Sequence, residues 1–180
     1  MGLARRSVRY NTGSPAGRVT VNQGDLRSPL PPGAAPPSGF DLVTGTPPYI
    51  PQGDGGVGRR PQKEPCNLEV RGGVEDYVAA AARVMAPGGR FVVVMGVQGQ
   101  RRRDRVRAAA GAHGLEVARC VEVVPREGKP PLMHVYVIRW LQGGGSEAPV
   151  ERLIVRDAQG RLSPEMHAAR AAIGMPPARV

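Results

Sequence analysis

A short apolar segment, residues 40–44, runs directly into Gly45-Thr46-Pro47-Pro48-Tyr49. Proline fixes its own φ angle and has no N–H, so the carbonyl groups around two consecutive prolines point in fixed directions. Such carbonyls can accept hydrogen bonds from an amino group, and the aromatic ring that follows can stack on a planar base. The spacing therefore predicts a site for a flat, amino-bearing ring at the end of a strand. An ordinary Pro-Pro turn is the alternative interpretation.

Other polar residues have an ordinary structural interpretation beside the chemical one. Asp25, in Gly-Asp-Leu-Arg, is expected at the end of a strand, where its carboxylate could accept from an amine or simply form a turn. The histidines His113, His134 and His167 have no thiol or carboxylate at ligand spacing. No metal site is predicted.

The hydrophobic pattern around the motif predicts alternating strands and helices. Strands are expected over residues 18–23, 40–44, 90–95, 115–124, 132–140 and 151–155, and helices over 3–10, 74–85, 101–113 and from 163 onward. Pro87-Gly88-Gly89 is expected to end the helix that starts at Val74. This order predicts an open α/β sheet that closes with an antiparallel C-terminal hairpin.

The composition is that of one folded domain with long loops. The chain has 180 residues, 41% of them hydrophobic, together with 25 glycines and 19 prolines. Its net charge of +10 comes almost entirely from arginine and suits a polyanionic partner such as nucleic acid. A coding sequence that favours arginine everywhere would give the same charge, so the charge permits RNA without proving it.

The cysteines and the apolar runs bear on the compartment. Cys66 and Cys120 are far apart in the sequence, which indicates neither a disulfide framework nor a zinc site. No run reaches the 18 or more apolar residues that a membrane span needs. We expect an intracellular protein, most simply a cytoplasmic one. The arginine-rich first 20 residues leave an organellar transit peptide open.

The motif and its surroundings resemble the methyltransferases of the Asn-Pro-Pro-Tyr type, which use S-adenosylmethionine (SAM) to methylate amino groups. Within them the chain is most similar to the bacterial tRNA (adenine-N6)-methyltransferases. The likeness covers roughly residues 4–163 and rests on residues 24–27, 40–49, 74–94 and 153–161. It implies a Rossmann-like class I methyltransferase sheet, SAM as cofactor and tRNA or other RNA as partner.

On this resemblance the catalytic residues are Thr46, Pro47, Pro48 and Tyr49. The carbonyl of Pro47 would accept from the substrate amine, and Tyr49 would stack on an extruded adenine. The family usually has Asn or Asp where this chain has Thr46. A hydroxyl is shorter and can accept or donate a hydrogen bond, which leaves the identity of the methylated amine open.

The resemblance also assigns cofactor contacts to Asp25, Leu26 and Thr46, with the Asp25 carboxylate beside the adenine amine of SAM. The family holds SAM with a glycine-rich turn and an acid that come earlier, and nothing before Asp25 matches either. The chain is therefore expected to begin in the helix before the third strand and to lack the first two strands. Residues 40–44 would then form an exposed apolar edge, and this chain alone would bind SAM weakly or not at all.

Basic residues in the long segment after the motif are where the resemblance places RNA contacts. They are Arg59, Arg60, Lys63 and Arg71. A second basic run, residues 101–107, could also contact the RNA backbone. In both segments a solvated surface is the alternative interpretation.

Two classes of function stay open. The first is a SAM-dependent N-methyltransferase acting on an adenine amine in tRNA or other RNA. The second is a non-catalytic basic half-domain, truncated or degenerate, that binds RNA or completes a partner's sheet. In either case residues 1–141 would be a partial methyltransferase domain, and residues 142–180 a C-terminal extension with a short strand and a helix. A third interpretation is an unrelated α/β protein with a chance Pro-Pro-Tyr.

Overall fold

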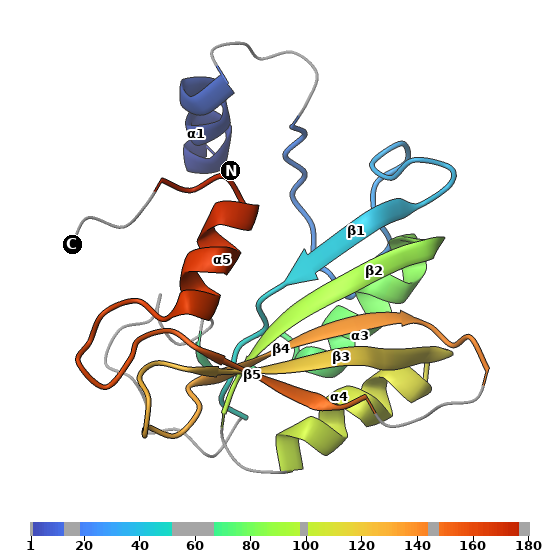
Figure 1. Ribbon diagram of the computed structural model, residues 1–180. Coiled ribbons are helices and arrows are strands. Elements are labelled where there is room, and N and C mark those ends of the chain that lie inside the picture. Colours follow the sequence, from blue (N-terminus) through green and yellow to red (C-terminus); the bar gives the residue numbers. More distant parts are fainter. Residues whose placement is uncertain (1, 13–18, 52–66, 98–100, 144–147, 177–180) are drawn as a thin grey trace.

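Five strands form one open sheet in the order β1-β2-β4-β3-β5 (Figure 1). The computed structural model describes residues 2–12, 19–51, 67–97, 101–143 and 148–176, and for residues 101–104 it describes the backbone only. The helices are α1 (Gly2–Thr12), α3 (Val74–Val84), α4 (Arg101–Gly111) and α5 (Pro164–Ala172). The strands are β1 (Phe40–Gly45), β2 (Met85–Gly96), β3 (Leu115–Val124), β4 (Met133–Trp140) and β5 (Val150–Ile154).

The strand directions bring several loops to one end of the sheet. β1 is parallel to β2, β3 is parallel to β5, and β4 runs antiparallel to both of its neighbours, β2 and β3. The carboxyl ends of β1, β2, β3 and β5 therefore lie together, toward the left of Figure 1. The predicted α/β sheet with an antiparallel C-terminal hairpin is confirmed, with β4 inserted between β2 and β3. β5, from the expected C-terminal extension, pairs with β3 and widens the same sheet.

The core lies between the sheet and helices α3 and α4. On α3, Val74, Val78 and Ala81 are buried at the spacing that puts them on one face of a helix. Alternate residues of β2, among them Phe91 and Val93, are buried against this face. Burying one such side chain stabilises the fold by about 1.5–3 kcal/mol. A charged residue at position 78 would break the contact between α3 and the sheet.

The start of β2 differs from the sequence prediction. The strand begins at Met85, and Pro87-Gly88-Gly89 lies within it instead of forming a turn after the helix. The register shifts here, because Phe40 pairs with Met85 while Leu42 pairs with Arg90. A Cβ on Gly89 would lie 2.7 Å from the carbonyl oxygen of Phe40, so this irregular stretch requires a glycine.

The predicted strand over residues 18–23 is wrong for its described part, because residues 19–23 form no strand. Their β-branched alternation needs a neighbouring strand to hydrogen-bond with, and none of the described strands pairs with them. β1 is correspondingly an edge strand in the described part of the chain, and its Leu42 is 59% exposed. The expected exposed apolar edge is confirmed.

Within the described segments no helix is both long and apolar enough to cross a membrane.

Candidate active site

The Thr46-Pro47-Pro48-Tyr49 motif leaves the carboxyl end of β1. Thr46 is exposed, Pro47 and Pro48 are buried, and Tyr49 is half-buried. Buried prolines are held by packing as well as by their rings, so the carbonyl groups of this turn have fixed directions. Carbonyls of fixed direction at the carboxyl end of a parallel strand are suited to bind a ligand there.

Gly96, the last residue of β2, provides the surface on which the Tyr49 ring packs. A Cβ built on Gly96 would lie 3.1 Å from Cγ and 3.2 Å from Cδ2 of Tyr49. Gly45 plays a similar part at the end of β1, where an added Cβ would lie 2.8 Å from Cδ1 of Tyr77. Gly96 was not among the site residues predicted from the sequence. The only signal was a glycine directly after an apolar strand.

The segment after the motif is fixed by backbone hydrogen bonds. The N–H of Ile50 donates to the carbonyl of Asn67 at 2.9 Å, and the N–H of Glu69 donates to the carbonyl of Ile50 at 2.9 Å. This forms an isolated parallel bridge between Ile50 and the buried Leu68. The chain on both sides of the motif is therefore held, by β1 before it and by this bridge after it.

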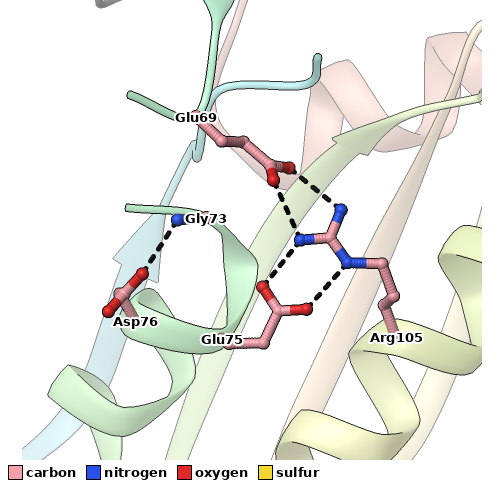
Figure 2. A network of polar contacts seen from close by, with 5 residues as sticks. All are labelled: Glu69, Gly73, Glu75, Asp76 and Arg105. Carbon is pink, nitrogen blue, oxygen red and sulfur yellow. Dashed lines mark hydrogen bonds and ion pairs between the residues drawn. The ribbon is translucent and has the colours of Figure 1, made fainter. Parts of the chain in front are cut away.

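Arg105 of α4 connects this bridge to the start of α3 (Figure 2). Its guanidinium donates to both carboxylate oxygens of Glu69, at 3.1 and 2.9 Å, and to both of Glu75, at 2.7 Å each. The Glu69 side chain is only 10% exposed. Asp76, one position further along α3, accepts from the N–H of Gly73 at 2.9 Å and so caps the helix. We call Arg105, Glu69 and Glu75 the Arg105 network.

The Arg105 network is electrostatically coupled. The hydrogen bonds from Arg105 lower the pKa of Glu75. The carboxylates of Glu75 and Glu69 raise the pKa of Arg105 above its ordinary value. Arg105 belongs to the basic run over residues 101–107 that was considered for RNA contact, and it is paired with these two carboxylates instead. The side chains of Arg101 to Arg103 are outside the described residues.

Asp25 lies in a turn and is bonded to Arg27. Its carboxylate accepts from the backbone N–H and the Nε of Arg27, both at 2.9 Å, and its carbonyl accepts from the N–H of Ser28. These hydrogen bonds from Arg27 hold the pKa of Asp25 well below its usual range, and the charge of Arg71 lowers it further. Asp25 and Arg71, assigned to cofactor and to RNA by the resemblance, are thus electrostatic neighbours.

A cavity of about 600 Å³ lies between residues 26–35, β1 and α3. Its walls are mainly apolar and include Leu26, Val43, Tyr77 and Phe91, with Thr44 from β1. Arg83 of α3 holds the outer wall by donating to the carbonyl of Leu26. In size and in its mainly apolar lining the cavity suits a small organic ligand.

The predicted site residues thus fall into three groups. Thr46 to Tyr49 follow the carboxyl end of β1, and Leu26, next to Asp25, lies in the wall of a cavity that reaches β1 at Val43 and Thr44. The exposed Arg71 lies just before α3. Arg59, Arg60 and Lys63 lie outside the described residues. Among the residues that the structure describes, no three histidine, cysteine or acidic side chains converge on one point.

No family model matches the chain, and no curated protein matches it. Among solved structures, it is similar to a predicted O-methyltransferase, protein Atu636 from Agrobacterium tumefaciens, with a TM-score of 0.64 and 20% sequence identity. The match covers 99% of this chain and 74% of that one.

Two further matches are the M1.HpyAVI–SAM complex and M1.HpyAVI, each with a TM-score of 0.35. Their identities are 12% and 11%, over 62% and 63% of this chain and 53% and 54% of theirs. Similarity at that TM-score does not establish a shared fold. The match to the predicted O-methyltransferase shows the fold alone: the chain has an open, Rossmann-like α/β sheet.

Proposed function

We propose that this chain is a SAM-dependent N-methyltransferase domain that methylates an exocyclic amine of adenine in tRNA or other RNA. One observation carries the proposal. The Thr46-Pro47-Pro48-Tyr49 motif stands at the carboxyl end of a parallel strand, with both prolines buried and the tyrosine ring packed on Gly96. The methyltransferase-type fold agrees with it.

The chemistry requires fixed acceptors because the lone pair of an exocyclic amine is delocalised into its ring. SAM, when bound, supplies a methyl group on a positively charged sulfur. The carbonyl of Pro47 accepts one amine N–H and the hydroxyl of Thr46 accepts the other, so the nitrogen becomes more tetrahedral. Tyr49 stacks on the base and orients its amine for attack on the methyl group that SAM would supply, and the amine proton leaves to solvent afterwards.

The cofactor assignment rests on Asp25, Leu26 and Thr46. Leu26 lines the apolar cavity beside β1, and Asp25 is ionised one residue before it. An ionised carboxylate can accept from the amine of an adenine ring that lies in the cavity. To do so Asp25 must share or release its hydrogen bonds with Arg27.

The first test is the transfer of a tritiated methyl group from SAM to bulk tRNA. At a SAM concentration high enough to offset the weak binding expected of this chain alone, we expect transfer, and a loss of at least 100-fold for Tyr49→Ala and for Pro47→Ala. Tyr10→Ala is the matched control, since Tyr10 is 89% exposed on α1, and it should keep full activity. Thr46→Asn, which supplies an amide oxygen, should retain transfer, and Thr46→Val should reduce it.

The competing function is the non-catalytic half-domain. It would be favoured by the absence of transfer to any RNA, together with RNA binding that Tyr49→Ala leaves unchanged. Thermal unfolding of each variant shows whether a loss of signal reflects the site or the fold.

A further inference from the structure

Two neighbouring turns project from the same end of the sheet as the motif. Residues 125–132 join β3 to β4, and residues 155–163 join β5 to α5. Because β1, β3 and β5 all run in the same direction, both turns lie at the carboxyl end at which Thr46 to Tyr49 leave β1. Both are visible at the left of Figure 1.

The two turns are fastened to each other. The N–H of Glu127 donates to the carbonyl of Arg156 at 2.8 Å, and the Glu127 carboxylate accepts from the N–H of Ala158 at 3.2 Å. The second turn closes on itself through a bridge between Arg156 and Leu162. Gly160 has a φ of +86°, and a Cβ there would lie 3.3 Å from Nη2 of Arg126, so the first turn packs over a glycine of the second. The two turns therefore present a single shaped surface.

This surface is basic. It exposes four cationic side chains, Arg126, Lys129, Arg156 and Arg161. It also has two carboxylates. That of Glu127 accepts a hydrogen bond from the backbone N–H of Ala158, and that of Asp157 is paired with Arg161 at 2.8 Å.

The four cationic side chains differ in whether they form hydrogen bonds or ion pairs within the protein. Arg156 donates to the carbonyl of Gly160 at 2.7 Å. Among the described residues, Arg126 and Lys129 have no hydrogen bond or ion pair from their side chains. We call the two turns together the basic platform.

We propose that the basic platform binds the phosphate backbone of a nucleic-acid substrate whose target base is presented to the Thr46–Tyr49 motif. The proposal rests on the proposed function for the identity of the target. Three to four strand spacings separate β1 from β3 and β5, which is roughly 14–19 Å. The platform is thus far enough from the motif to contact backbone beyond the target nucleotide, and it lies at the same end of the sheet. Phosphate contacts of this kind supply affinity and register without reading sequence.

The test is the double variant Arg126→Gln/Lys129→Gln, which removes two cations that hold no other described group. Binding of tRNA is measured against salt concentration by fluorescence anisotropy. We expect the slope of log K against log salt to become shallower by about 1.4–1.8, the value for two lost phosphate contacts. The KM for RNA should rise, while kcat at saturating RNA stays unchanged.

The control is Arg90→Gln/Arg139→Gln, which removes the same charge near the opposite end of the sheet. Because Arg139 is paired with Glu116 at 2.8 Å, thermal unfolding of this variant is measured beside its RNA binding. An unchanged slope in the platform variant, or an equal change in the control, overturns the proposal. Binding is measured separately with tRNA, single-stranded DNA and duplex DNA, and the tightest binding identifies the class of nucleic acid that the platform prefers. The binding measurement needs no methyl transfer. A shallower slope without any methyl transfer therefore supports phosphate binding by the basic platform and contradicts the proposed enzyme function. Methyl transfer with an unchanged slope supports the enzyme function and contradicts phosphate binding by the platform.

Discussion

The ring of Tyr49 lies on the backbone of Gly96, so closely that a single methyl group on the glycine would come within 3.1 Å of Cγ. β2 thus ends in the one residue type that leaves room for the ring. Gly96→Ala requires the ring to move by a few tenths of an ångström, and Gly96→Val requires more. We expect Gly96→Val to lower kcat at least tenfold by tilting Tyr49, with a smaller loss for Gly96→Ala, measured by methyl transfer at saturating RNA.

Gly88→Ala is the control for this experiment, because Gly88 lies on the same strand and an added Cβ there would meet nothing within 4 Å. Equal losses from the two alanine variants would mean that β2 is sensitive to any added side chain. In that case the contact between Gly96 and Tyr49 has no special role.

The Arg105 network predicts a long-range effect on the site. Arg105→Ala leaves the nearly buried Glu69 carboxylate without its cation and frees the bridge that follows the motif. We expect a loss of about 1–3 kcal/mol in the free energy of unfolding, measured by urea denaturation, together with reduced methyl transfer. Arg119→Ala breaks the more exposed pair with Glu151 and should change stability by less than about 1 kcal/mol. If both variants behave alike, the burial of Glu69 is not what matters.

The same network predicts a dependence of stability on pH. Hydrogen bonds from Arg105 lower the pKa of Glu75 from its usual value of 4.5 in the folded state. The folded protein therefore binds this proton less readily than the unfolded chain does. The resulting stabilisation is complete above about pH 4.5 and is lost as the pH falls below it.

Urea unfolding between pH 3 and pH 7 checks this expectation. Glu75→Gln should flatten the decline of the free energy of unfolding at acidic pH. Glu165→Gln, at an exposed carboxylate on α5 that forms no ion pair among the described residues, should leave the decline as it is. If the decline is unchanged in Glu75→Gln, it is caused by other carboxylates, such as Glu122. Burial raises the pKa of Glu122, but His134 and Arg152 lower it by more, so its pKa is below the usual value.

The edge strand β1 predicts self-association. Leu42 is 59% exposed on a strand whose outer side has no partner in the described part of the chain. Leu42→Lys should lower the oligomer fraction seen by sedimentation at high protein concentration. Leu132→Lys, at an equally exposed leucine (58%) outside any strand, should not. If neither substitution or both of them lower it, β1 is not the contact.

Local pattern was enough to predict much of this fold. The helix at Val74 and the strands β3 and β4 follow from their periodicity, and the strand that precedes Thr46 follows from its apolar run. The missed features depend on contacts between distant residues. Three of them each depend on a residue more than 30 positions away: the packing of Tyr49 on Gly96, the pairing of Arg105 with Glu69 and the register shift at Gly89. The strand expected at residues 18–23 fails for the same reason, since a strand depends on its neighbours as much as on its own residues.

Because β1 lies at an edge of the sheet, it should open locally more often than the central strands do. β4, bonded on both sides, should exchange its amide hydrogens slowly and mainly through global unfolding. β1, bonded on one side, should exchange through local opening at a much lower free energy. The carbonyls after Gly45, which are the acceptors in the proposed function, are thus attached to an edge of the sheet that opens more readily than its centre. A ligand that occupies them should slow exchange in β1 far more than in β4.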